Sequence, residues 1–412
     1  MPAATERDAL SLLTAQAVRD RAGMMLEIGL RDELSHFMID LDRMDTVADA
    51  VIIAIRKNYP SLNIPFHARW RHFAIDGVDR WVRIADRASW PDRAARARAE
   101  FDLAIVSVLL DAGAGPAWCY RDGVSGKAIG RSEGLAIASL DMFAGGAFSS
   151  DARDPFRGDA EKLAEFSVAD LERGFQVSAE NPLVGLEGRA DLLRRLGRHL
   201  AGRKDVFATR DTPRPGGLFD HLVSRVKENA IAAPSILHEV LLQLGPIWPS
   251  RLSLAGVPLG DCWKHSAIKA GDATDGLVPL HKLSQWLTYS LIEPLQRAGL
   301  DVTDIDGLTG LAEYRNGGLF VDLGALSLRK PGDADRPHEV DSTLVVEWRA
   351  LTVALLDRLA EKIRARLHRG AASLPLASLL EGGTWAAGRA AAFERRADGS
   401  PPIKVISDGT VF

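Results

Sequence analysis

The stretch LVVEWRALTVALLDRLAEKIRARLHR, residues 344–369, decides the fold class of this chain. Its large apolar side chains recur at steps of three and four residues: Leu344, Trp348, Leu351, Leu355, Leu359 and Ile363. This spacing places them on one face of an α-helix. The stretch therefore predicts a long helix that ends near Arg369.

Four further segments show the same helical period. They are Met44–Ile55, which ends before Pro60; a helix starting near Pro91 with Phe101, Ile105 and Val108; a helix starting at Asn181-Pro182 with Leu186 to Leu200; and a helix opened by Pro279 with Leu280 to Leu291. Asparagine before proline is a typical helix start. Pro294 should bend or end the last of these helices.

Strand patterns are few. Ile403–Ile406, followed by an Asp408-Gly409 turn, and Trp118–Arg121 are the two segments that favour strands. No repeat or linker divides the chain, and the polar stretches Ser149–Gly158 and Arg329–Pro337 are expected to be surface loops. We predict one mainly α-helical domain over residues 1–412 with a few short β-strands. If it divides into two lobes, the expected bounds are about 1–150 and 180–412.

Composition excludes several classes of protein. Among 412 residues, 51 are Lys or Arg and 55 are Asp or Glu, so no basic excess suggests a nucleic-acid partner. The longest apolar run, Leu103–Leu110, is far shorter than the roughly 20 residues that span a membrane. Charges near the start do not fit a signal peptide. Two cysteines cannot build a disulfide framework or a cysteine-based zinc site, so we expect a reduced, cytoplasmic protein.

Short motifs do not identify a function. Asp111-Ala-Gly-Ala-Gly115 resembles the glycine-rich loop of a methyltransferase, but the residues before it follow a helical period, which favours a helix-ending turn. A nucleotide-binding loop stays open as the alternative. The chain lacks a P-loop around Gly126-Lys127, a His-Glu-x-x-His pair and a Gly-x-Ser-x-Gly elbow. No metal site is predicted.

The segment 280–293 carries unusual polar side chains. Lys282, Gln285 and Tyr289 follow each other at steps of three and four, on a face beside the leucine stripe. That face is either solvated or lines a polar cleft, and the sequence leaves both open.

A second unusual segment is Glu313-Tyr-Arg-Asn-Gly-Gly318. The glycine pair should end a short helix and permit close backbone approach, which places Glu313 and Arg315 beside a turn. The alternative is a surface ion pair of little energetic weight. Further on, Glu347 and Arg349 lie inside the long apolar helix, where buried charges need partners. A structural ion pair is favoured there over a ligand contact.

Several longer motifs together resemble a known family. They are RWRHF (69–73), DAGAG, RSEGLAIASLDMF (131–143), NPLVGLEGR (181–189), HKLSQWLTYSLIEPL (281–295), EYRNGGLFVD (313–322) and the tail SDGTVF (407–412). The chain looks like the fungal and bacterial uracil-catabolism family, the fourth-named protein of the URC route, long described as a domain of unknown function. The resemblance implies a pathway in which uracil, first made into its ribonucleotide, is ring-opened and its nitrogen is released as urea.

The C-terminal half also resembles, more distantly, the queuosine-5′-phosphate salvage hydrolases. The similar segments are His281-Lys-Leu-Ser-Gln285, Asp304-Ile-Asp306, Ala312-Glu-Tyr-Arg315 and Leu323-Gly-Ala-Leu326. Those enzymes have a fold like that of the helix-hairpin-helix DNA glycosylases and cleave an N-ribosidic bond. Their active-site lysine and aspartate fall on Lys282 and Glu313, with Glu one methylene longer than Asp.

Together the two resemblances imply an N-ribosyl hydrolase that releases urea and ribose 5-phosphate from a ribosylurea-5′-phosphate-like intermediate. Glu313 and Lys282 would be catalytic, without metal or organic cofactor. Substrate-binding candidates are His281, Gln285 and Tyr314 beside them, with Arg315, Arg131 and Arg349 for the 5′-phosphate, and His72 and Asp141 as residues that line the site or only pack and cap. The expected partner is a small ribonucleotide-derived substrate, with no nucleic acid or membrane; the oligomeric state is not predicted. The alternatives are a nucleosidase acting on uridine monophosphate and a non-catalytic nucleotide-binding protein of the pathway.

Overall fold

A computed structural model describes residues 4–208, 212–226, 228–248 and 252–406. Helices dominate these residues, and every strand within them is two or three residues long and pairs with a single other strand. The prediction of a mainly α-helical fold with a few short strands is therefore confirmed. The likeness to helix-hairpin-helix glycosylases stays a prediction, and the Asp408-Gly409 turn with the tail motif lies outside the described residues.

The chain forms two compact units, each assembled from separate segments. Of the described residues, the first comprises 4–67, 252–285 and 304–406, and the second comprises 68–208, 212–226, 228–248 and 286–303. Helix α13 (Lys282–Arg297) starts in the first unit and continues in the second.

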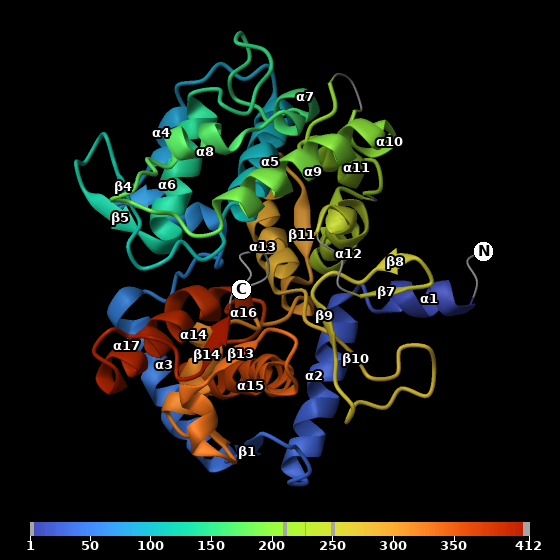
Figure 1. The fold of residues 1–412 in the computed structure, drawn as a ribbon, viewed down its shortest axis with the longest axis vertical. Coiled ribbons are helices and arrows are strands. Elements are labelled where there is room, and N and C mark those ends of the chain that lie inside the picture. Colours follow the sequence, from blue (N-terminus) through green and yellow to red (C-terminus); the bar gives the residue numbers. More distant parts are fainter. Residues whose placement is uncertain (1–3, 209–211, 227, 249–251, 407–412) are drawn as a thin grey trace. The chain divides into compact units, whose positions relative to one another are not determined.

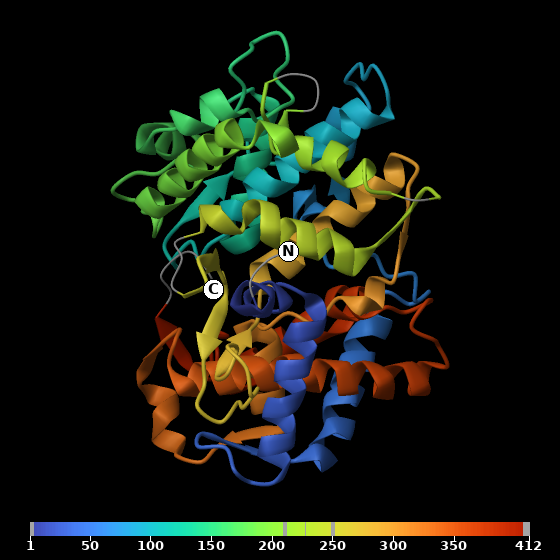
Figure 2. The same cartoon turned by 90° about the vertical axis from the view of Figure 1, so that its right-hand side faces the viewer.

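The long predicted helix is the centre of the first unit. It is α15 (Thr343–Leu367), capped at its start by the Ser342 hydroxyl, which accepts the N–H of Val345, and stopped at its end by His368 in the left-handed conformation. Its apolar stripe is fully buried. Helices α2, α3 and α14 pack on it, and the N-terminal helices beside α15 can be followed in Figures 1 and 2. The helices of this unit are α1 (Ala4–Ser11), α2 (Ala15–Leu30), α3 (Met44–Asn58), α14 (Tyr314–Asp322), α15, α16 (Leu376–Leu379) and α17 (Trp385–Arg395).

Short segments connect these helices. The 3-10 turns are η1 (Leu41–Arg43), η4 (Ile305–Gly307) and η5 (Pro331–Asp335), and η6 (Leu380–Thr384) is a π-helical turn. The strand pairs are β1 (Phe37–Ile39) with β12 (Leu326–Leu328), β7 (Ser253–Leu254) with β8 (Val257–Pro258), β9 (Cys262–Lys264) with β10 (Leu277–Pro279), and β13 (Pro337–Glu339) with β14 (Lys404–Ile406). The last strand confirms the prediction for Ile403–Ile406.

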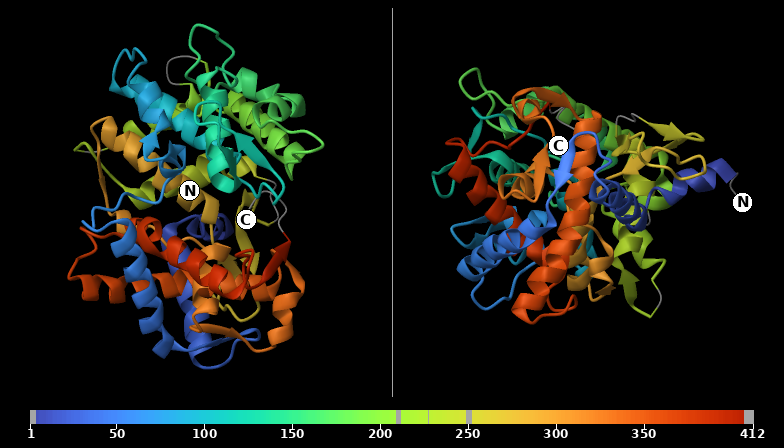
Figure 3. Two further views of the ribbon diagram at one scale, coloured as in Figure 1. Left: turned by 90° about the vertical axis from the view of Figure 1, so that its left-hand side faces the viewer. Right: turned by 90° about the horizontal axis from the view of Figure 1, so that it is seen from below.

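The second unit is a group of helices around the buried helix α5 (Arg93–Leu109), whose N-cap is Asp92. Helices α6 (Arg131–Ala144) and α9 (Leu186–Gly202) contact α5, and α8 (Val168–Gly174) contacts both α6 and α9. The left view of Figure 3 shows the helices of this unit in cyan to green. The other helices are α4 (Arg80–Ala85), α6 (Arg131–Ala144), α7 (Ala160–Ala164), α8 (Val168–Gly174), α9 (Leu186–Gly202), α10 (Lys204–Phe207), α11 (Gly217–Val223) and α12 (Ala233–Leu244), with 3-10 turns η2 (Arg69–Phe73) and η3 (Gly245–Ile247). Its strand pairs are β2 (Ala74–Ile75) with β3 (Val78–Asp79), β4 (Cys119–Arg121) with β5 (Ala128–Gly130), and β6 (Ala230–Ala232) with β11 (Asp301–Thr303).

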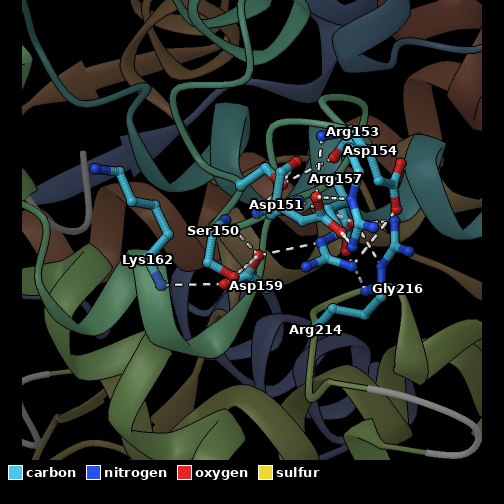
Figure 4. Close-up of polar contacts among 12 residues, drawn as sticks. Ser150, Asp151, Arg153, Asp154, Arg157, Asp159, Lys162, Arg214 and Gly216 are labelled. Atoms are coloured by element: carbon cyan, nitrogen blue, oxygen red, sulfur yellow. Dashed lines mark hydrogen bonds and ion pairs between the residues drawn. The ribbon is translucent and has the colours of Figure 1, made fainter.

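The polar loop 149–158 of the second unit is held by two carboxylates. Asp159 caps α7 through the N–H of Lys162 and also accepts hydrogen bonds from the N–H of Ser150 and from Arg157, as Figure 4 shows. Asp102, fully buried on α5, accepts the N–H of Gly158 and bonds Arg214. The loop carries no helix or strand, but these contacts fix its two ends.

Two predicted helix starts are wrong. Helix α9 begins at Leu186, after Gly185 in the left-handed conformation, and not at Asn181. The Asn181 side chain instead bonds the backbone N–H and carbonyl of Cys119, which fixes strand β4. Helix α13 begins at Lys282 because Pro279 belongs to strand β10.

Pro294 does not end its helix. The ring removes the N–H that would bond the carbonyl four residues earlier, that of Ser290. The indole Nε1 of Trp70 donates to this carbonyl at 2.6 Å, so the carbonyl keeps a partner and α13 continues to Arg297.

The glycine pair 317–318 lies inside helix α14, so the prediction that it ends a helix is wrong. The predicted close approach is present. A Cβ on Gly317 would lie 2.7 Å from Nε1 of Trp348 and 2.8 Å from the hydroxyl of Thr352, both on α15. Only glycine allows α14 to lie this close to α15.

We expect Gly317→Ala to lower the free energy of unfolding by about 1–3 kcal/mol, the range for overpacking a tight contact. The matched control is Gly23→Ala in the middle of helix α2, where a Cβ meets nothing within 4 Å. That change should raise stability by about 0.4–1 kcal/mol because alanine restricts the unfolded chain. Urea unfolding of both variants measures the difference, and a stable Gly317→Ala protein contradicts the packing described.

Candidate functional site

The start of helix α13 is fixed by Asp261. Its backbone carbonyl accepts the N–H groups of Leu280 and His281, and its carboxylate accepts the N–H of Lys282 at 2.9 Å. His281 takes a left-handed conformation with φ of 45° just before the helix begins. Lys282 is thus the first helical residue. Hydrogen bonds to Asp261 fix the backbone from which its side chain extends.

Arg349 connects this helix start to the segment before Glu313. Its two terminal nitrogens bond the two oxygens of Asp261, each at 2.8 Å, and its Nε donates to the carbonyl of Ala312 at 3.0 Å. The Arg349 side chain is 1% exposed. One buried guanidinium therefore sets the position of Lys282 relative to the residue that precedes Glu313.

Glu347, two residues earlier on α15, has different partners. Its carboxylate accepts the N–H groups of Ser35 and His36 and lies 3.2 Å from Nε2 of His265. The expectation that both buried charges of this helix have structural partners is met, although they do not pair with each other.

The carboxyl group of Asp261 has a pKa of about 2. Burial by itself raises this pKa, but the charge of Arg349 and the hydrogen bonds from Arg349, Lys282 and Trp263 outweigh the effect of burial. The group is therefore ionised whenever the protein is folded near neutral pH.

Gln285 provides a second connection between the same two segments. Its Nε2 donates to the hydroxyl of Thr309 at 2.9 Å, and its Oε1 accepts the N–H of Thr309 at 3.4 Å. Both side chains are fully buried. The predicted face of α13 is thus not solvated at Gln285, where it binds the segment that leads to Glu313.

Glu313 is the N-cap of helix α14. Its two carboxylate oxygens accept the N–H groups of Arg315 and Asn316, both at 2.6 Å. Such a pair of hydrogen bonds aims the carboxylate, and the positive end of the helix dipole favours its charge.

The electrostatics of Glu313 include Lys282. Burial raises the pKa of the Glu313 carboxyl above its usual value. The two capping N–H groups and the positive charges of Lys282 and Arg315 oppose this rise. The positive charge of Lys282, 31 positions away in the chain, is thus one of the charges that favour the ionised form of Glu313. A carboxyl group with a raised pKa beside an ammonium is suited to acid–base chemistry.

The next candidates of the first unit are chain neighbours of Lys282 and Glu313. His281 is buried, which lowers its pKa, and its Nε2 contacts the carbonyl of Leu12 at 2.9 Å. Tyr314 is 39% exposed, and the guanidinium of Arg315 lies 5.4 Å from its ring centre. Arg315 also donates to the carbonyl of Gly399, while its buried Nε has no hydrogen bond among the described residues.

Three candidates belong to the second unit. Arg131 is exposed at the first position of α6. Asp141 accepts a hydrogen bond from the hydroxyl of Tyr120 at 2.8 Å, and burial raises the pKa of its carboxyl. His72 lies edge-on against the ring of Trp286.

Sequence reasoning missed Asp261 and Thr309, which hold the two segments of the site together. Neither belongs to a recognisable motif, since each acts through a partner far away in the chain. Within the described ranges, no group of three or more His, Cys, Asp or Glu side chains could hold a metal ion. No helix in those ranges is long and apolar enough to cross a membrane.

Comparisons with known proteins extend over nearly the whole chain. A family model described as "Protein of unknown function (DUF1688)" matches residues 11–412. "Protein urg3" of Schizosaccharomyces pombe is 40% identical over 411 residues, covering 97% of this chain and 98% of that protein. "Uracil catabolism protein 4" of Lachancea kluyveri is 39% identical over 410 residues, covering 92% of each chain. The resemblance to the uracil-catabolism family is confirmed by these matches.

We expect Asp261→Asn to destabilise the protein by about 3–5 kcal/mol at pH 7, because it leaves the buried Arg349 without a counter-charge. The wild type should also lose stability as the pH falls from about 4 to 2. An unfolded aspartate has a pKa of ~3.9, whereas the folded value is about 2, so the carboxylate stabilises the fold above pH 4 and this contribution, roughly 2–3 kcal/mol, disappears on protonation.

Urea unfolding between pH 2 and 7 measures both effects. In Asp261→Asn the decline between pH 4 and 2 should be shallower than in the wild type. Asp45→Asn is the matched control, because Asp45 makes its ion pairs with Lys362 and Arg366 at the surface. Equal free energies of unfolding for Asp261→Asn and Asp45→Asn would contradict the role assigned to Asp261.

Proposed function

The chain belongs to the family described as protein of unknown function (DUF1688), and from this membership and from the site around Glu313 we propose that it acts in uracil catabolism as an N-ribosyl hydrolase. The name of the Lachancea kluyveri relative, "Uracil catabolism protein 4", supports the pathway. The observation that supports the reaction is the Glu313 carboxylate, which two backbone N–H groups orient and on which the charge of Lys282 acts. The resemblance to the salvage hydrolases aligns their active-site lysine and aspartate with these two residues.

The proposed substrate is a ring-opened uridine nucleotide of the ribosylurea-5′-phosphate type. Its products are ribose 5-phosphate and urea. Cleaving the bond between C1′ and nitrogen develops positive charge on the sugar and negative charge on the departing nitrogen. The carboxylate of Glu313 stabilises the sugar cation and accepts a proton from the attacking water. A positioned acid–base group contributes about 10²–10⁴ in rate, which is roughly 3–6 kcal/mol of barrier.

The ammonium of Lys282 orients the Glu313 carboxylate and donates a proton to the departing nitrogen, which leaves as neutral urea. The proton that Glu313 takes from the attacking water then restores the ammonium of Lys282. Arg349 does not contact the substrate in this mechanism. Its three nitrogens are engaged with Asp261 and Ala312, so we assign it the positioning of Lys282 and Glu313 rather than the binding of phosphate. Arg315, two residues beyond Glu313 and with its Nε without a hydrogen bond among the described residues, is the first candidate for the 5′-phosphate.

We expect purified protein to convert ribosylurea 5-phosphate into equimolar ribose 5-phosphate and urea. Uridine monophosphate serves as the comparison substrate, and it should be cleaved much more slowly because its intact ring is not the proposed leaving group. Release of uracil from uridine monophosphate at the higher rate would make the protein a nucleosidase. Tight binding of ribosylurea 5-phosphate without turnover would make it a non-catalytic binding protein.

We expect Glu313→Gln to lower kcat by about 10²–10⁴-fold while the protein stays folded, since the amide oxygen can still accept one of the two capping N–H groups of α14. Thr14→Ala is the matched control for the loss of a helix cap, because Thr14 accepts the N–H of Ala17 at the start of α2. It should cost about 0.5–2 kcal/mol of stability and leave kcat unchanged. Lys282→Met should lower kcat in the same direction as Glu313→Gln. Full activity in Glu313→Gln would exclude the catalytic role of Glu313, even if the protein does release urea from ribosylurea 5-phosphate.

A further inference from the structure

Asn316 lies in direct contact with the carboxylate of Glu313. Its backbone N–H donates to Oε1 of Glu313 at 2.6 Å, in the first turn of helix α14. Its side chain belongs to the same turn. The amide Nδ2 lies 3.5 Å from the carbonyl oxygen of Leu311, which also accepts the N–H of Glu313 at 2.9 Å. Both the backbone and the side chain of Asn316 are therefore placed at the candidate site.

The amide oxygen of Asn316 has no hydrogen bond among the described residues, although Asn316 is only 2% exposed. The contact with Leu311 decides which end of the amide this is. Only the nitrogen can face a carbonyl oxygen, because two oxygens repel each other, so Oδ1 is the end that turns away from Leu311. A buried amide oxygen without a partner is costly to the fold. Such an oxygen is suited to a ligand that supplies the missing donor.

Helix formation does not explain an asparagine at this position. The N-cap, where asparagine stabilises a helix, is occupied by Glu313. Asn316 is the third residue of α14, and inside a helix asparagine is less favourable than alanine or leucine. The polar side chain therefore fits a role toward a ligand better than a role in the fold.

A ligand can reach this turn from solvent at Glu313. Glu313 keeps part of its surface exposed and Tyr314 is 39% exposed, whereas Asn316 is buried. A substrate that contacts the Glu313 carboxylate thus meets the Asn316 amide next, further inside. An amide oxygen only accepts hydrogen bonds, so the ligand group that it binds must be a donor, such as a hydroxyl or an N–H.

The stereochemistry of the proposed substrate decides between these donors. In a β-ribonucleotide the base, or the ureido group left by ring opening, stands on one face of the sugar, and the 2′- and 3′-hydroxyls stand on the other. The attacking water approaches C1′ opposite the leaving group, and Glu313 takes its proton. The carboxylate, and with it Asn316, thus belongs on the side of the hydroxyls. The 2′-hydroxyl is the nearer of the two, because its carbon is bonded to C1′.

We infer that Oδ1 of Asn316 accepts a hydrogen bond from the 2′-hydroxyl of the substrate, an inference that rests on the proposed function. As positive charge develops at C1′, the neighbouring O–H becomes a stronger donor, so this hydrogen bond strengthens in the transition state. Asn316 thereby selects ribosyl over 2′-deoxyribosyl compounds. A neutral amide suits this position, since a second carboxylate would raise the pKa of Glu313 further.

The test combines two variants with two substrates, ribosylurea 5-phosphate and 2′-deoxyribosylurea 5-phosphate. Each rate is divided by that of the uncatalysed hydrolysis, and the wild type should prefer the ribosyl compound. In Asn316→Ala this preference should fall by about 10–100-fold, the size of one hydrogen bond to a buried acceptor. The loss should appear in kcat rather than in KM. Asn316→Asp keeps an acceptor and should keep the preference, even where its added charge lowers kcat on both substrates.

Thr384→Val is the matched control. The hydroxyl of Thr384 also has no hydrogen bond within the part of the chain that the structure describes, and Thr384 is 1% exposed, but it lies on the π-helical turn η6. Its removal should leave the preference for the ribosyl compound unchanged. An asparagine with a purely structural role would lower the activity of Asn316→Ala on both substrates by the same factor, and that result overturns the inference.

Two results with the wild type separate this inference from the proposed function, and neither depends on how the variants fold. Equal acceleration of both hydrolyses removes the contact with the 2′-hydroxyl and leaves the N-ribosyl hydrolase intact. A wild type that cleaves neither compound removes the proposed function together with the role of Asn316.

Discussion

The buried ion pair of Arg349 and Asp261 is the contact on which the candidate site depends. Removing two charges from water is costly, and well-packed apolar residues in the same space are often as stable or more stable. Stability alone therefore does not account for such a pair at the centre of the first unit. Its geometry does, because the planar guanidinium bonds Asp261 at the start of α13 and the carbonyl of Ala312 at the same time. An apolar replacement could fill the space but could not hold both segments at fixed positions.

Two charged residues of helix α15 hold different segments of the first unit in place. Glu347 and Arg349 are two residues apart, so they leave the helix in different directions. Glu347 fixes the segment at Ser35 and His36 and contacts His265, whereas Arg349 fixes the segments that carry Lys282 and Glu313. The apolar stripe of the same helix forms the core. Core packing and the position of the candidate catalytic groups thus depend on one element, which explains why the pattern of residues 344–369 carries so much structural information.

The sequence predicts what is local and misses what is set by distant partners. The period of apolar residues gives α3, α5 and α15 with small errors at their ends. The start of α9 could not be predicted, because Asn181 binds Cys119 across 62 positions and a left-handed glycine begins the helix instead. The continuation of α13 through Pro294 depends on the indole of Trp70, 220 positions away from Ser290. Motif resemblance predicts Lys282 and Glu313 as site residues, but no pattern marks Asp261, whose partner Arg349 lies 88 positions away.

Glu313 combines a structural role as a helix cap with the electrostatic properties that its proposed chemical role needs. As the cap of α14 it accepts two short hydrogen bonds from backbone N–H groups, which orient it and by themselves make it a weaker base. The charges of Lys282 and Arg315 act in the same direction, yet burial outweighs all of them and the pKa of the carboxyl is raised. A solvated carboxylate with the same partners would be oriented but poorly basic. Burial therefore leaves Glu313 with a raised pKa although a helix end holds its carboxylate in place, which is what the proposed uptake of a proton from water requires.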